Sequence, residues 1–208
     1  MNKFTYDTSS YKFAEILESV FFVKDLSTLH ENLETFNVDT DQSSKYHSVF
    51  YELAEGHEFF INFKRFIQDE IRPLFDEEML FQKKPTFRVH MKENIAVGGY
   101  HRDRDYNHSE DEINFYLPLT EAFDSNTIWV ESEEDEGDFS PMEASYGEYY
   151  MWDGANLKHG NKKNTTGKTR VSVDFRVLPK SKYKPSGKKS ITQGVAFEIG
   201  KYYDELVV

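Results

Sequence analysis

The sequence predicts a mainly β domain with flanking helices, of the β-sandwich or jelly-roll class. After Pro85 the chain contains six short segments rich in β-branched and aromatic residues, several of which alternate apolar and polar positions. Gly, Asn, Asp and Pro separate these segments, and no helical pattern lies between them. Before Pro85 the apolar residues recur at helical spacing instead. We therefore expect two facing β-sheets, with N-terminal helices packed against one of them.

Two N-terminal stretches have the apolar spacing of amphipathic helices. The first covers residues 9–22, where Ser9 or Ser10 can cap the helix and apolar residues follow at positions 13, 16, 17, 20 and 21. The second covers residues 47–71, with an apolar face from Phe50 to Ile71 and a proline two residues after its end. Gly56 is the point at which this second helix can break.

The six segments after Pro85 are the expected strands, and they read "TFRVHM", "NIAVGGY", "EINFYLPL", "TIWVES", "EYYMWD" and "TRVSVDFRVL". Residues 179–190 form a basic loop rich in Pro, Ser and Gly, and the tail after it is expected to add an edge strand. We therefore expect a single domain over residues 1–208. It has a mostly helical part (1–85), a β core (86–179) and a C-terminal extension (180–208).

Composition excludes several classes of function. The chain has 208 residues and a net charge of −12, which disfavours a nucleic-acid-binding protein because such proteins need a basic surface. It contains no cysteine, which excludes disulfides, zinc–thiolate sites and thiol nucleophiles. Neither a signal peptide nor an apolar run of membrane-spanning length is present. We expect a cytoplasmic protein that binds neither nucleic acid nor membranes.

Three residues predict a metal site. His101 and Asp103 are two residues apart at the expected end of a strand, and alternate residues of a strand point the same way. His159 follows the later strand "EYYMW" and can supply a third ligand from across the sheet. Two imidazoles and one carboxylate form the open triad that binds non-haem Fe(II). Asp105 is an alternative carboxylate ligand, and His108 lies in the polar loop that follows.

The strand "TRVSVDFRVLP" carries a possible binding site for a carboxylate. Arg170, Ser172, Asp174 and Arg176 share one face of this strand, and apolar residues share the other face. The polar face can meet either solvent or a wet cavity. Arg170 lies eleven residues after His159, and a guanidinium with a neighbouring hydroxyl can bind one carboxylate. Arg176 is either a second contact of this kind or an ion-pair partner for an acid.

The ordered set of His-x-Asp, distal His and Arg-x-Ser resembles the Fe(II)- and 2-oxoglutarate-dependent oxygenases. The chain is similar to their phytanoyl-CoA dioxygenase-like branch, and most of all to the small streptomycin-biosynthesis type of carbohydrate gene clusters. This resemblance covers residues 86–179. It implies a double-stranded β-helix in which His101, Asp103 and His159 hold Fe(II). It also implies that 2-oxoglutarate binds this iron, that its far carboxylate pairs with Arg170 and Ser172, and that O2 oxidises a substrate C–H bond.

Other residues are candidates for the pocket. Asn114 and Tyr116 share a face of "EINFYLPL" and are expected either to contact the 2-oxoglutarate or to form ordinary cross-strand pairs. Arg88 and His90 alternate along "TFRVHM" and can meet substrate or cosubstrate if they point inward. Trp152 is interpreted as a core residue rather than as a substrate contact.

The expected reaction is hydroxylation of a small molecule of the sugar or aminocyclitol class, a class that comes from the resemblance. Halogenases of the same superfamily lack the carboxylate ligand, whereas Asp103 is present here. The acidic run 131–139 and the negative net charge favour a neutral or cationic substrate. Two alternatives stay open, namely a non-catalytic jelly-roll binding module and a cupin-type metal enzyme that needs no 2-oxoglutarate. The Arg170-x-Ser172 pair argues against both.

Overall fold

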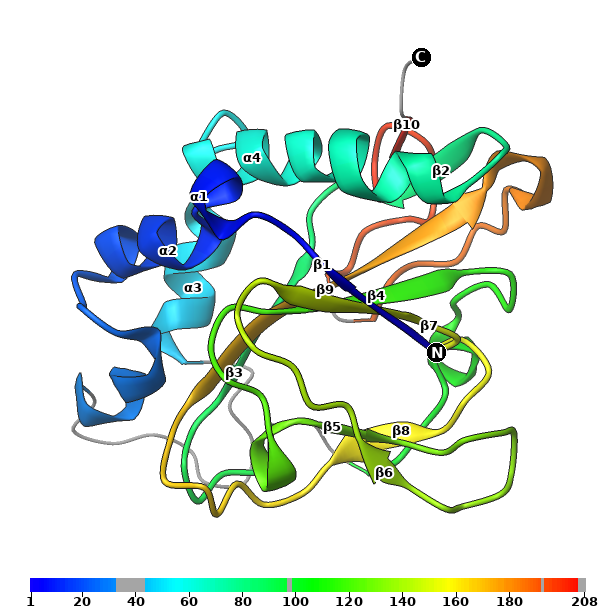
Figure 1. Ribbon diagram of the computed structural model, residues 1–208. Helices are drawn as coiled ribbons and strands as arrows, with labels where there is room; N and C mark the ends of the chain where they lie inside the picture. Colours follow the sequence, from blue (N-terminus) through cyan, green and yellow to red (C-terminus); the bar gives the residue numbers. More distant parts are fainter. Residues whose placement is uncertain (33–43, 97–98, 192, 206–208) are drawn as a thin grey trace.

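The protein is built from two β-sheets that face each other (Figure 1). The computed structural model describes residues 1–32, 44–96, 99–191 and 193–205. The larger sheet has seven strands, whose ladders are antiparallel. In spatial order they are β1 (Asn2–Thr5), β7 (Glu148–Trp152), β4 (Ile113–Pro118), β9 (Arg170–Pro179), β2 (Met79–Gln82) and β10 (Tyr203–Glu205), and β3 (Thr86–His90) also pairs with β9. The smaller sheet contains β6 (Ser140–Pro141), β5 (Ile128–Val130) and β8 (His159–Asn161). This architecture confirms the predicted fold class.

The helices gather on one side of the larger sheet, as Figure 1 shows. The expected helix at 9–22 is two helices, α1 (Thr8–Tyr11) and α2 (Phe13–Phe21), because Lys12 adopts a left-handed backbone with φ of 48°. The expected helix at 47–71 is also divided, into α3 (Lys45–Glu52) and α4 (Glu58–Phe66), which continues as a π-helical turn over Ile67–Ile71. The break includes Gly56, as the sequence indicated.

The main hydrophobic core lies between these helices and the apolar face of β9. Phe175 stacks on Phe115 of β4 with ring centroids 5.0 Å apart, and Phe63 of α4 meets it edge-on at 5.1 Å. Each fully buried Phe of this kind contributes about 1.5–3 kcal/mol through burial alone. The opposite, polar face of β9 is buried as well. It therefore meets an interior cavity between the two sheets, which was one of the two environments that the sequence allowed.

Several local expectations are corrected by the structure. Residues 94–96 of the expected strand 94–100 form no regular structure, and residues 97–98 lie outside the described ranges. The chain turns at Glu93, which has φ of 62°, and Asn94 then bonds to the main chain of Asn164 instead of joining a ladder. The short strands β1, β2, β6 and β8 were not predicted. The expected C-terminal edge strand is confirmed as β10, which pairs with β2. Among the helices that the structure describes, none could cross a lipid bilayer.

Candidate active site

The backbone brings His101 and His159 side by side. The two residues form an isolated antiparallel bridge, in which each N–H donates to the other's carbonyl at 3.0 and 2.9 Å. Asp103 is not on this bridge but begins a 3-10 turn over Asp103–Tyr106, and its N–H donates to the Gly154 carbonyl at 3.0 Å. The expectation that one strand end presents both His101 and Asp103 is therefore wrong. A tight turn after Arg102, capped by the Asp105 carboxylate, directs Asp103 inward instead.

The side chains of His101, Asp103 and His159 converge on one point. One ligand atom from each residue lies within 4.8 Å of the other two. The Nε2 atoms of His101 and His159 are 3.8 and 3.6 Å from Asp103 Oδ1. Their Nδ1 atoms face the carbonyls of Gly99 and Leu157 at 3.1 and 3.0 Å. A carbonyl can only accept, so Nδ1 carries the proton and the Nε2 lone pairs are free to bind a metal. This donor set fits Fe(II).

Burial and nearby charges set the protonation of the triad. Burial favours a high pKa for Asp103, but the charges of Arg176 and His159 outweigh it and hold the pKa of this carboxyl well below its usual range. Burial lowers the pKa of His159 to about 4, although Asp103 opposes this shift. At neutral pH the carboxylate is therefore ionised and the imidazole is neutral, which are the forms that bind metals.

Neither alternative ligand joins this cluster. Asp105 accepts from the Arg102 N–H at 3.2 Å, so it stabilises the turn. His108 pairs with buried Glu112 at 2.7 Å. The metal-ligand group found among the described residues is His101, Asp103 and His159.

Arg176 contacts the triad rather than standing free in the cavity. Its Nε and Nη2 donate to Asp103 Oδ2 at 3.0 and 2.8 Å, and its Nη1 donates to Asp174 Oδ2 at 2.7 Å. Of the two roles that the sequence left open, the structure shows the ion pair. A contact between Arg176 and 2-oxoglutarate stays a prediction.

Arg170 is a buried cation with neutral partners. Its side chain is among the largest that are fully buried, with 1% exposure. The guanidinium donates to the Asn126 carbonyl at 2.9 Å, to Ser172 Oγ at 2.8 Å and to Asn161 Oδ1 at 3.0 Å. No carboxylate of the described residues forms an ion pair with it. An unpaired buried charge is costly, so this arrangement favours an anionic ligand. Sequence reasoning missed Asn161, a neutral residue two positions after His159.

The two groups of residues share one cavity between the sheets. Arg170 and Asn161 line it together with His101, His159 and Arg176. Trp152 also lines it, with its ring edge-on to that of His159 at 4.7 Å, and belongs to an apolar cluster.

The other candidates from the sequence lie close by. Asn114 lines the cavity, and its amide nitrogen donates to Asp103 Oδ2 at 2.6 Å. The Tyr116 ring lies 6.0 Å from the Arg170 guanidinium. Arg88 points into the cavity and binds Asp174 at 2.8 Å. His90 instead faces the carbonyls of Asn94 and Asn126.

Comparison with known proteins places the chain in a family. No family model matches it. The streptomycin biosynthesis protein StrG of Streptomyces griseus is 38% identical over 211 residues, which cover 98% of this chain and 99% of StrG. The chain belongs to the StrG family. This membership, together with the triad, confirms the resemblance to the streptomycin-biosynthesis type of non-haem oxygenase.

Superposition on solved structures compares the fold of this chain with known folds. The apo form of the non-haem monooxygenase ThoJ superposes with a TM-score of 0.50 at 10% identity, over 89% of this chain and 75% of ThoJ. CytC3 with Fe(II) and alpha-ketoglutarate gives a TM-score of 0.49 at 12% identity, over 85% of this chain and 78% of CytC3. The ThoJ match shows the fold alone, and it agrees with the jelly-roll architecture of this StrG-family chain.

The acidic run of this StrG-family chain is folded against the metal-binding segments. Asp135 pairs with Arg102 and, at 2.7 Å, with Lys158, while Glu134 pairs with Arg104. These three cations flank Asp103 and His159 in the sequence. The run therefore neutralises local basic residues, and two of its acids do not form a free negative rim.

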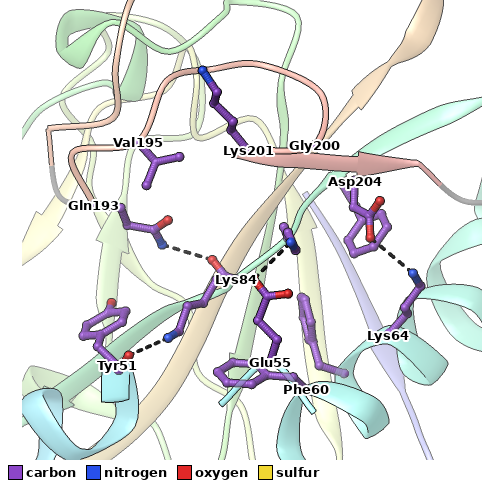
Figure 2. Close-up of a pocket in the computed structure, with 13 residues that line it drawn as sticks. Tyr51, Glu55, Phe60, Lys64, Lys84, Gln193, Val195, Gly200, Lys201 and Asp204 are labelled. Atoms are coloured by element: carbon purple, nitrogen blue, oxygen red, sulfur yellow. Dashed lines mark hydrogen bonds and ion pairs between the residues drawn. The ribbon is translucent and has the colours of Figure 1, made fainter. Parts of the chain in front are cut away.

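A second hollow, drawn in Figure 2, is lined by residues other than those of the triad. It has a volume of about 830 Å³ and an aromatic floor that includes Phe60 and Phe63 of α4. Its lysines are engaged by other groups, since Lys64 pairs with Asp204 at 3.2 Å and Lys84 donates to the Tyr51 carbonyl at 2.7 Å (Figure 2). Its lining contains none of the metal-ligand group, so this hollow is separate from the candidate active site.

Proposed function

We propose that the protein is an Fe(II)- and 2-oxoglutarate-dependent oxygenase that hydroxylates a C–H bond of a small sugar-like or aminocyclitol-like molecule. The observation that carries this proposal is the pairing of two features in one cavity. One is the converging triad of His101, Asp103 and His159. The other is the buried guanidinium of Arg170, which forms no ion pair with a carboxylate of the described residues. The cosubstrate has two carboxylates, one for the metal and one for a cation, and this cavity offers a partner to each.

The residues of the chain have separate roles in this proposal. Bound Fe(II) would supply the oxidising chemistry, in which 2-oxoglutarate and O2 yield succinate and CO2 while one oxygen atom enters the substrate C–H bond. His101 and His159 present unprotonated Nε2 atoms to the metal, and Asp103 presents an ionised oxygen. Arg170, oriented by Ser172 and Asn161, binds the far carboxylate of the cosubstrate.

The substrate class follows from the family rather than from the cavity. StrG is named as a streptomycin biosynthesis protein, and the sugar or aminocyclitol class is the one that the resemblance to oxygenases of carbohydrate gene clusters implies. The presence of Asp103 favours hydroxylation over halogenation, because the carboxylate would fill the position that a halide needs. A neutral or cationic substrate is still expected from the net charge of −12. The acidic run supports this expectation less, because Glu134 and Asp135 are paired.

Release of CO2 from 2-oxoglutarate labelled at C1 tests the proposal. We expect release that requires both Fe(II) and O2 and that a sugar or aminocyclitol substrate accelerates. Asp103→Asn should abolish it, whereas the matched variant Asp105→Asn keeps a capping oxygen at the turn and should retain most of it. A metal-dependent reaction that proceeds without 2-oxoglutarate would support the cupin-type alternative. Absence of any turnover in protein with iron bound would favour the non-catalytic binding module.

A further inference from the structure

A chain of alternating charges, of which all but the first are buried, ends at the carboxylate of Asp103. Arg88 of β3 pairs with Asp174 of β9 at 2.8 Å, Asp174 pairs with Arg176 at 2.7 Å, and Arg176 pairs with Asp103 at 2.8 Å. Arg176 and Asp174 are 6% and 8% exposed, and the side chain of Arg88 is 18% exposed. Arg176 is thus held from both sides, and Gln82 and Thr86 accept further bonds from its Nη1, each at 3.4 Å.

The two oxygens of Asp103 have different surroundings. Oδ2 accepts three hydrogen bonds, two from Arg176 at 3.0 and 2.8 Å and one from the Asn114 amide at 2.6 Å. Oδ1 faces the Nε2 atoms of His101 and His159, which carry no proton in the tautomer described above. The lone pairs of Oδ2 are therefore used within the protein, and those of Oδ1 are left for a metal.

The Asn114 amide has a fixed orientation for the same reason. Oδ2 of the ionised carboxylate can only accept, so the amide nitrogen must face it. The backbone of Gly154 packs against this amide so tightly that an added Cβ would lie 2.5 Å from Asn114 Nδ2. Oδ2 of Asp103 is thus hydrogen-bonded to the guanidinium of Arg176 and to the closely packed amide of Asn114.

We propose that Arg176, assisted by Asn114, is a positioning residue that reserves Oδ2 of Asp103 and so makes Asp103 a one-oxygen ligand. This inference rests on the proposed metal centre and adds a role that the triad does not itself define. Without these hydrogen bonds the carboxylate could rotate and offer both oxygens to the ion. The second oxygen would then fill a position that the cosubstrate or O2 needs. Lysine could not replace the fork, because an ammonium is a point charge and cannot hold one oxygen through two nitrogens.

Co(II) binding to the whole protein tests the proposal without turnover, through its affinity and its visible d–d absorption. Loss of an outer partner of a metal ligand typically weakens metal binding about 10- to 100-fold. We expect a loss of this size in Arg176→Gln, together with a changed d–d spectrum, and a partial recovery in Arg176→Lys. Asn114→Leu should show a smaller loss in the same direction. The matched control is Arg72→Gln, which removes a part-buried arginine that bonds to the Phe75 carbonyl outside the cavity and should bind Co(II) like wild type.

Circular dichroism and thermal unfolding establish that each variant is folded. If Arg176→Gln does not fold, Arg176→Lys and Asn114→Leu decide the question. Folded variants that bind Co(II) within about threefold of wild type and with an unchanged spectrum would overturn the positioning role, since outer partners normally matter by more than that. Failure of the wild type itself to bind one Co(II) would instead refute the proposed metal centre, so the two failures are distinct.

Discussion

Replacement of Arg170 should separate cosubstrate binding from metal binding. The guanidinium is buried and bonds to Asn126, Ser172 and Asn161, and none of these residues belongs to the triad. Arg170→Ala would leave the far carboxylate of 2-oxoglutarate buried without a cation. Truncating one partner of such a pair costs roughly 2–5 kcal/mol, and about 1.4 kcal/mol corresponds to a factor of ten. The dissociation constant of 2-oxoglutarate should therefore rise by about 30-fold or more.

Arg170→Lys should recover part of this loss, because the ammonium keeps the charge but not the bidentate contact. The assay is anaerobic titration of the metal-loaded protein with 2-oxoglutarate by calorimetry. The same samples are titrated with Co(II), whose affinity should stay within about threefold of wild type because outer partners, not remote residues, change it 10-fold or more. Arg72→Gln serves as the control here too. If Arg170→Ala bound 2-oxoglutarate like wild type, the reasoning from an unpaired buried cation would be refuted.

Three further outcomes follow from individual residues. Ser172→Ala removes one hydrogen bond to Arg170 and should weaken 2-oxoglutarate binding about 2- to 10-fold in the same titration. Gly154→Ala would place a Cβ 2.5 Å from the Asn114 amide nitrogen, so Co(II) affinity and thermal stability should both fall, whereas Gly56→Ala, which meets nothing within 4 Å, should change neither. Burial lowers the pKa of His47 to about 4, so the folded protein binds this proton less readily than the unfolded chain does. The free energy of unfolding is therefore highest above about pH 6.5 and decreases as the pH falls towards 4. At pH 5 it is lower by about 2 kcal/mol than at neutral pH. Urea unfolding at pH 7 and pH 5 measures this loss, which His47→Gln should reduce; an equal pH dependence in both proteins would contradict it.

The sequence contained most of the information on what the site is made of. The strict alternation from Arg170 to Val177 separates an apolar face from a polar face, and the structure places the first against the helices and the second in the cavity. The types and order of His101, Asp103 and His159 predicted that these three side chains lie together, and the structure places them in one group that could hold a metal ion.

The geometry of the site could not be read in the same way. Asp103 points inward because a turn redirects the chain, so the period of a strand gave the right residue for the wrong reason. Asn161 and Gly154 carry no charge and follow no period, and their roles depend on contacts made across the fold, with Arg170 and with Asn114. The pairing of Arg176 with Asp103 joins residues 73 positions apart, and no local pattern specifies it. The acidic run is also misleading alone, since its partners Arg102, Arg104 and Lys158 lie elsewhere in the chain.

The central claim is that one cavity holds both a metal and a dicarboxylate, and an anaerobic crystal structure with Fe(II) and 2-oxoglutarate tests it most directly. We predict an iron anomalous peak at bonding distance, roughly 2.0–2.2 Å, from His101 Nε2, His159 Nε2 and Asp103 Oδ1. We also predict 2-oxoglutarate density that extends from this peak to the guanidinium of Arg170. Iron bound away from these three atoms, or 2-oxoglutarate bound without a contact to Arg170, would contradict the account.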